Sequence, residues 1–211
     1  MLLGTGVGSL SAVTQQGPGT TMTAKASEQS TRATQVTIDE NDVAIDKDTG
    51  LITDFTNAEK AVQLLAGGEL VIPETIGEGE NKVTVTGIGV KSISNQLGVF
   101  DAYYLRDVAG ISDGTMPGIS KLTFAKPDNI KHIGDWGFWG NQLTTVNLPA
   151  ATEIGEGAFG SNRLTTLNLP AATEIGRDAF WNNQLTTVNL PAATEIGEYA
   201  FQGNALTRVR R

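Results

Sequence analysis

LTTVNLPAATEIGEGAFGSNR at positions 143–163 recurs almost unchanged as LTTLNLPAATEIGRDAFWNNQ at 164–184 and as LTTVNLPAATEIGEYAFQGNA at 185–205. A fourth copy begins with LTRVRR at Leu206, so the period is 21 residues. A unit this short cannot bury its apolar side alone, and it becomes stable by stacking on its neighbours. The sequence therefore predicts a repeat solenoid. It also favours a repetitive binding surface over a single catalytic pocket.

Each repeat contains two sets of apolar residues. Leu143, Val146 and Leu148 have the spacing of a short strand whose alternate side chains point inward, and Pro149 ends that strand because it has no N–H to donate. Stacking then predicts three inward columns and a polar one. The columns are Leu143, Leu164, Leu185 and Leu206; Ile154, Ile175 and Ile196; Phe138, Phe159, Phe180 and Phe201; and the asparagines Asn141, Asn162, Asn183 and Asn204. We expect the asparagines to hydrogen-bond buried backbone groups, and the glycine after each isoleucine to begin a tight bend.

The second half of the repeat carries the motif I-G-x-x-A-F. It stands at Ile154–Phe159, Ile175–Phe180 and Ile196–Phe201, with a degenerate copy at Ile133–Phe138. After a strand that ends in proline, this motif resembles the BspA-type leucine-rich repeats of bacterial surface proteins. The resemblance covers residues 119–211.

The resemblance implies a right-handed coil with short parallel strands on one face and loops or 3-10 turns on the other. It also implies a secreted or surface-displayed protein, in some members an adhesin for host proteins, without catalytic residues. Upstream, residues 70–73 and 86–89 look like an eroded copy of the same repeat.

Composition argues against catalysis and metal binding. The chain has no cysteine and only one histidine, His132, which we expect to be an ordinary surface residue. A thiolate metal site, a histidine cluster and a Ser/His/Asp triad are therefore not expected, and the sequence indicates neither an enzyme nor a cofactor.

Charge is unevenly distributed along the chain. Residues 119–211 carry 8 Lys/Arg and 8 Asp/Glu, whereas residues 1–118 carry 7 and 15, so the net charge of −8 lies in the first part. No basic stripe follows the repeats, so nucleic acid is not an expected partner. The acidic part serves solubility, with attraction of a cationic partner as the alternative.

The amino-terminal segment has features of an export signal. Residues 2–13 are mildly apolar but too few to span a membrane as a helix, and Ala24-Lys25-Ala26 offers a cleavage site. No basic residue precedes Lys25, so the positive end of a signal peptide is missing. We predict a signal-peptide-like segment at 1–26 and a disordered linker at 27–34. The alternative is a disordered polar tail over about residues 14–34, which are rich in Thr, Ser, Gln and Gly.

Residues 35–118 are expected to form an amino-terminal cap, mainly β, before the leucine-rich repeats of 119–211. A strand at 35–45, a turn at 46–50 and a strand at 51–53 predict a hairpin over the open end of the repeats. Thr56 and Glu59 form a capping-box pattern that predicts one short helix at about 57–66. The aspartates of the turn fail the spacing of a calcium loop, so no metal is expected there. Residues 98–118 are predicted to be an insertion loop, which is a second location for binding.

Two sets of residues are candidates for binding. The outward positions of the strands form two rows: Thr145, Thr166, Thr187 and Arg208, and Asn147, Asn168, Asn189 and Arg210. They either form a polar strip for a sugar or a protein, or they are simply good strand residues that pair along the ladder. Trp139 and Trp181 follow the core phenylalanines and either anchor a partner or cover the gap above Gly160. Trp136 is expected to be exposed.

Together these features predict a non-enzymatic, extracellular or cell-surface binding module, adhesin-like, for a host or matrix protein or a glycan. The alternative is an architectural spacer of a larger surface protein. No membrane span is expected. Arg211 falls on an inward column, where an unpaired charge cannot be buried, so the carboxyl-terminal arginines are expected to protect an open strand edge and keep the protein monomeric. The alternative is that the chain is cut here and the arginines are incidental.

Overall fold

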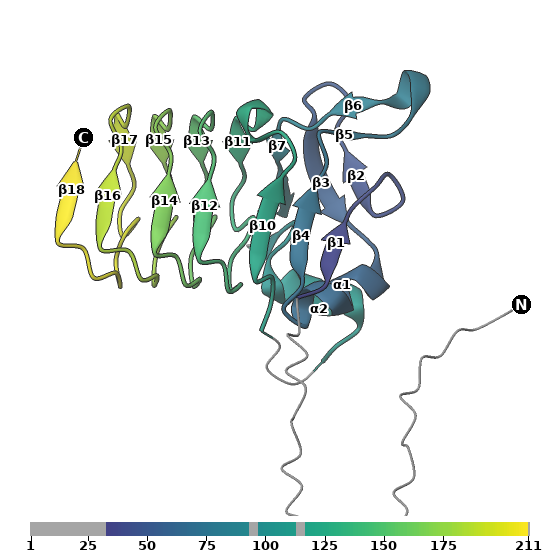
Figure 1. The fold of residues 1–211 in the computed structure, drawn as a ribbon, viewed down its shortest axis with the longest axis horizontal. Helices are drawn as coiled ribbons and strands as arrows, with labels where there is room; N and C mark the ends of the chain where they lie inside the picture. Colours follow the sequence, from purple (N-terminus) through teal and green to yellow (C-terminus); the bar gives the residue numbers. More distant parts are fainter. Residues whose placement is uncertain (1–32, 93–96, 113–116, 211) are drawn as a thin grey trace, which may run out of the picture. The chain divides into compact units, whose positions relative to one another are not determined.

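The computed structural model describes residues 33–92, 97–112 and 117–210 (Figure 1). The predicted signal-peptide-like segment at 1–26 and nearly all of the predicted linker at 27–34 lie outside these residues. Within the described ranges, no helix has the length and apolarity that a membrane crossing requires.

The repeats contribute two rows of short strands, which Figure 1 shows side by side from β10 to β18. The first strands are β10 Lys121–Phe124, β12 Thr145–Asn147, β14 Thr166–Asn168, β16 Thr187–Asn189 and β18 Arg208–Arg210. The second strands are β11 His132–Ile133, β13 Glu153–Ile154, β15 Glu174–Ile175 and β17 Glu195–Ile196. Pairing is parallel and joins residues one repeat apart, such as Thr145 with Thr166 and Glu153 with Glu174.

The two rows differ in continuity. The second strands belong to one seven-stranded sheet in the order β17-β15-β13-β11-β7-β3-β2. The first strands are divided among separate sheets: β10 lies in a three-stranded sheet in the order β1-β4-β10, whereas β12 pairs only with β14, and β16 only with β18. The sequence predicted loops or 3-10 turns on the face opposite the first strands. This was wrong where the two-residue second strands form. The helix η2 Pro127–Asn129 is the single 3-10 turn in the described repeats.

The phenylalanine column is a continuous stack of rings. Phe138, Phe159, Phe180 and Phe201 have ring centroids 5.3–5.6 Å apart and planes within 9° of parallel. Phe100, which lies before the predicted repeats, extends the stack with its centroid 5.7 Å from that of Phe138. Rings at this spacing exclude water from the centre of every repeat, and their burial supplies a large part of the stability.

The asparagine column confirms its predicted backbone role. Asn162 donates its side-chain amide to the carbonyls of Phe138 and Phe159, and its side-chain oxygen accepts the N–H of Leu143. Asn141 and Asn183 make equivalent bonds and are also buried. Each asparagine thus connects its own repeat to the preceding one.

The glycine after each isoleucine is needed because neighbouring repeats approach closely at this position. A Cβ added at Gly176 would lie 2.5 Å from the carbonyl carbon of Gly155, and one at Gly197 would lie 2.4 Å from the backbone nitrogen of Arg177. None of the three glycines has a positive φ. The expected role in a tight bend is therefore replaced by a steric one.

The cap contains more elements than the sequence predicted. Its strands are β1 Gln35–Thr37, β2 Val43–Ile45, β3 Leu51–Phe55, β4 Glu69–Ile72, β5 Thr75–Ile76, β6 Val83–Thr84, β7 Gly87–Ile88, β8 Val90–Ser92 and β9 Leu97–Gly98, with the 3-10 helix η1 Gly79–Asn81. β4 pairs with β10 and β7 pairs with β11, so residues 70–73 and 86–89 contribute strands to the two rows, as the eroded copy predicted. The β2–β3 hairpin lies at the end of the seven-stranded sheet.

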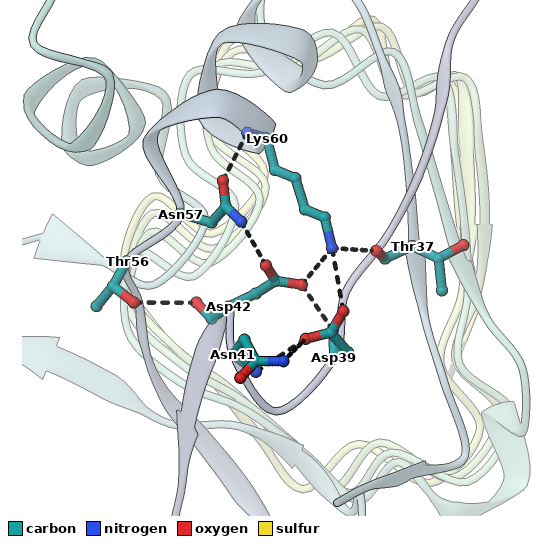
Figure 2. A network of polar contacts seen from close by, with 7 residues as sticks. All are labelled: Thr37, Asp39, Asn41, Asp42, Thr56, Asn57 and Lys60. Carbon is teal, nitrogen blue, oxygen red and sulfur yellow. Dashed lines mark hydrogen bonds and ion pairs between the residues drawn. The ribbon is translucent and has the colours of Figure 1, made fainter. Parts of the chain in front are cut away.

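The predicted single strand at 35–45 was wrong, because it is broken after Thr37. β1 pairs in parallel with β4, whereas β2 pairs with β3 in the other sheet. A network of polar contacts between the two strands explains the break (Figure 2). Asp42 is 1% exposed, and its carboxylate accepts bonds from the amide of Asp39, the side chain of Asn57 and the ammonium of Lys60. A buried carboxylate needs these donors, and collecting them turns the chain out of the strand.

Lys60 ties this network to the first helix. Its ammonium also contacts the carboxylate of Asp39 and donates to the carbonyl of Thr37. Burial acts to lower the pKa of Lys60, but the hydrogen bond and charge of Asp42 outweigh it and raise that pKa. The N–H of Asn41 lowers the pKa of Asp39, against the smaller opposing effect of burial.

The cap has two helices, so the prediction of one was wrong. α1 Ala58–Leu65 occupies the predicted place, with Asn57 rather than Thr56 accepting the N–H of Lys60 as its cap. α2 Ala102–Ala109 lies where an insertion loop was expected. The signals for α2 were Asp101 as its cap and Gly110, in the left-handed conformation, as its end.

Asp101 makes the stability of the fold depend on pH. It is 1% exposed, and burial raises its pKa to about 7 although the N–H groups of Tyr104 and Tyr103 bond to it. Below about pH 4 this carboxyl is protonated in both states. As pH rises from about 4 to about 7, only the unfolded chain loses the proton, so the free energy of unfolding falls and then levels.

We expect Asp101→Asn to remove roughly 2–4 kcal/mol of that fall, because asparagine caps a helix without titrating. Urea unfolding at about pH 4.5, 6 and 8 measures the slope. Asp39, whose pKa is lowered, changes stability only below this window and serves as an internal reference. An unchanged slope in the variant would contradict the assignment.

Candidate functional site

The outward side chains of the first strands form a polar surface. Val146 and Val188 point inward and are 2% and 3% exposed, while their neighbours along the strands are all exposed. The exposed set is Thr145, Asn147, Thr166, Asn168, Thr187, Asn189, Arg208 and Arg210. The structure thus places all eight strand candidates on one surface, which we call the strand face.

Hydrogen bonding along the strand face is interrupted. Thr165 donates its N–H to Thr144 O, and Thr207 donates to Thr186 O, at 2.9 and 2.8 Å. The bonds from Leu148 to Asn168 and from Leu190 to Arg210 follow the same pattern. Within the described repeats no equivalent bond crosses from β14 to β16, and β14 has no ladder with β16.

Hollows open where the strands are not paired. One of about 290 Å³ lies between β14 and β16, and we call it the β14–β16 slot. It is lined by Thr165, Thr166, Leu167, Thr187, Val188, Asn189, Arg208 and Arg210. Two others, of about 180 and 490 Å³, lie between β10 and β12 and include Thr145 and Asn147 in their walls. Asn168, by contrast, donates its side-chain amide to the side-chain oxygen of Asn147 at 2.6 Å. This bond is the pairing along the ladder that the sequence offered as the alternative to ligand binding.

The tryptophans form an aromatic cluster beside the core stack. The rings of Trp139 and Trp181 lie 5.6 Å apart and 3° from parallel, and both are partly buried. A Cβ on Gly160 would lie 2.0 Å from the ring of Trp139, so this ring occupies the space that the glycine leaves. Trp136 contacts Trp139 edge-on and is partly buried, not freely exposed as expected. These contacts agree with packing, and they leave the partner-binding reading of the tryptophans as a proposal.

A row of glutamates on the seven-stranded sheet was not identified from the sequence. Glu153, Glu174 and Glu195 are adjacent in register and border a groove of about 720 Å³. His132 at one end is partly exposed, and its Nδ1 lies 2.9 Å from Glu153. The recurring T-E-I-G contained the signal, because the residue before an inward isoleucine must point outward. In the described ranges, no three metal-ligating side chains are grouped to hold an ion.

Chemically, the strand face offers hydroxyl, amide and guanidinium groups, which can bind a ligand by hydrogen bonds and ion pairs. The β14–β16 slot brings five of the candidate residues into one hollow: Thr166, Thr187, Asn189, Arg208 and Arg210. The sequence could not predict the slot. Strands β12, β14 and β16 have almost the same residues, so nothing in them indicates that β14 pairs with β12 and not with β16.

Comparison with known proteins supports the repeat assignment. Residues 107–207 match, in six copies, the family described as BspA type leucine rich repeat region. A search of curated proteins gives no match. A leucine rich cell surface protein from Faecalibacterium prausnitzii A2-165 is 19% identical over 79% of this chain and 52% of its own, with a TM-score of 0.35. The chain thus spans about half the length of that structure.

Proposed function

Because residues 107–207 belong to the BspA-type leucine-rich repeat family, we propose that this chain is a non-enzymatic protein-interaction module, displayed on the bacterial cell surface or secreted. The partner is a host or matrix protein, which gives the module an adhesin-like role, and the strand face binds it. The observation that carries the proposal is the alignment of eight exposed polar residues over successive repeats, with hollows between strand pairs.

The geometry of this surface suits a protein partner. Paired parallel strands lie about 4.8 Å apart, so within each pair identical groups recur at a spacing that many weak contacts can use together. Exposed threonine and asparagine lose little on desolvation when a partner supplies matching donors and acceptors. The arginines at one end add charge, which contributes orientation and rate of association.

The second candidate is an architectural spacer. The bond between Asn147 and Asn168 and the packing of Trp139 over Gly160 favour it, because both show candidate residues used inside the fold. A spacer would retain no matrix protein by itself.

The test is a triple variant, Thr145→Glu, Thr166→Glu and Thr187→Glu, in binding to a panel of immobilised extracellular-matrix proteins. We expect the wild-type chain to bind at least one of them and the variant to lose at least tenfold in affinity, because three bulky charges then cover the strand face. The control variant adds the same charge outside this face, at Gln142, Gln184 and Gln202, and should bind as wild type.

Circular dichroism must show that both variants are folded, since like charges on adjacent strands weaken a sheet. Equal binding by the folded triple variant would exclude the strand face, and the tryptophan cluster or residues 98–118 would then be tested. Failure of the wild-type chain to bind any panel member would favour the spacer.

A further inference from the structure

We infer that the β14–β16 slot binds a glutamate or aspartate side chain from an acidic segment of the protein partner. This inference rests on the proposed function and specifies which part of the strand face reads the charge of the partner. It is carried by three features of the slot: its unpaired backbone, its unpaired arginines and its opened apolar floor.

The backbone on both sides of the slot has hydrogen-bonding capacity that the neighbouring repeat does not use. In the β12–β14 and β16–β18 pairs, bonds of 2.8–3.1 Å close the strands at both ends. Across the slot, the amides of Thr186 and Leu169 make no such bond to the facing strand in the described repeats. Backbone groups need partners, and an unpaired group beside a hollow can bond to water or to a ligand that replaces it.

The charge of the slot is positive. Arg208 and Arg210 are exposed, line the slot and form no ion pair with any described carboxylate. No acidic residue lines it. The hollow between β10 and β12 differs, because Glu69 and Lys121 at its wall pair with each other at 3.3 Å. A guanidinium that has no internal partner is suited to a carboxylate, which it holds through two parallel hydrogen bonds.

The floor of the slot is apolar and accessible. Leu167 is partly exposed, whereas Val146 and Val188 at the equivalent positions of the adjacent strands are buried. The methylene groups of a glutamate can cover Leu167 while its carboxylate reaches the arginines. Hydroxyls of Thr166 and Thr187 stand on opposite sides of the slot and can bond to the same ligand.

The experiment measures binding of a fluorescein-labelled hexaglutamate peptide to the full chain by fluorescence anisotropy at low salt. Hexaglutamine and hexalysine peptides are the controls for charge. We expect hexaglutamate alone to bind, with an affinity that falls as salt is added. Arg208→Gln with Arg210→Gln should weaken binding at least tenfold. Lys131→Gln with Arg163→Gln makes the same change in net charge at exposed residues outside the slot and should have no effect.

A second pair of variants tests the slot without touching charge or β18. Thr166→Tyr places a ring in the slot and should block hexaglutamate. Thr84→Tyr makes the same change at an exposed threonine of β6, outside the strand face, and should leave binding intact. Equal losses in the two charge variants, or in the two tyrosine variants, would overturn the inference. So would binding of a hyaluronan hexasaccharide but not of hexaglutamate, which would identify an acidic glycan as the ligand.

Failure of this inference is distinguishable from failure of the proposed function. If the Thr→Glu triple variant loses a matrix protein while Thr166→Tyr and the Arg208/Arg210 variant retain it, the strand face binds without the slot. If all of them retain it, the strand face is not the binding surface.

Discussion

Phe180→Ala is expected to lower the free energy of unfolding by about 3–5 kcal/mol, the usual loss for a fully buried ring. Phe180 is 0% exposed, and its ring stacks between those of Phe159 and Phe201 at 5.6 and 5.3 Å. Neighbouring rings belong to rigid, bonded repeats and cannot collapse into the cavity. Urea unfolding followed by circular dichroism measures the loss.

The matched control is Phe201→Ala. Phe201 is partly exposed and belongs to the last ring pair found in the described residues, so its removal opens less of a cavity. We expect it to cost about half as much as Phe180→Ala. If Phe180→Ala costs less than about 1 kcal/mol, the ring does not hold the repeats together.

Asn183→Ala should have the second largest effect, about 2–4 kcal/mol. The side chain of Asn183 is 7% exposed, accepts the N–H of Leu164 and donates to the carbonyls of Phe159 and Phe180. Alanine leaves the Leu164 amide buried without its acceptor. The carbonyls keep bonds from Asn162 and Asn204, which limits the loss.

Asn204→Ala is the control for this variant. Asn204 makes the same kinds of bond, but it is only partly buried, so water can replace what alanine removes. Thermal unfolding of the two variants should therefore separate them, with the lower midpoint for Asn183→Ala. Equal midpoints would mean that burial does not determine the strength of the asparagine column.

Sequence alone predicted the features that depend on the repeat period. Leu143, Phe159 and Asn162 recur every 21 residues, so stacking in register fixed their columns and their burial. The eight outward strand residues followed from the same alternation. The period also revealed the eroded copy around β4 and β7, whose backbone pairs with the repeats even though few of its residues match.

The features that sequence could not predict depend on contacts outside the period. The strand at 35–45 breaks because Asp42 gathers donors from Asn57 and Lys60, which lie on a different element. The two-residue strands of the second row are too short to show an alternation. The β14–β16 slot lies where β14 and β16 form no ladder, although their sequences are nearly identical to those of paired strands, so no residue type predicts its position.

The asparagine column also has a direction, which bears on how the chain is made. The N–H groups of Leu143, Leu164 and Leu185 each bond to an asparagine 19 residues later in the chain. During synthesis the amino-terminal residues appear first, so every repeat waits for the following one before its buried amide has an acceptor. Folding of the growing chain therefore trails synthesis by one repeat. The newest repeat is always the incomplete one, and the cap, with its own buried network around Asp42, is the part that can settle before any repeat has been finished.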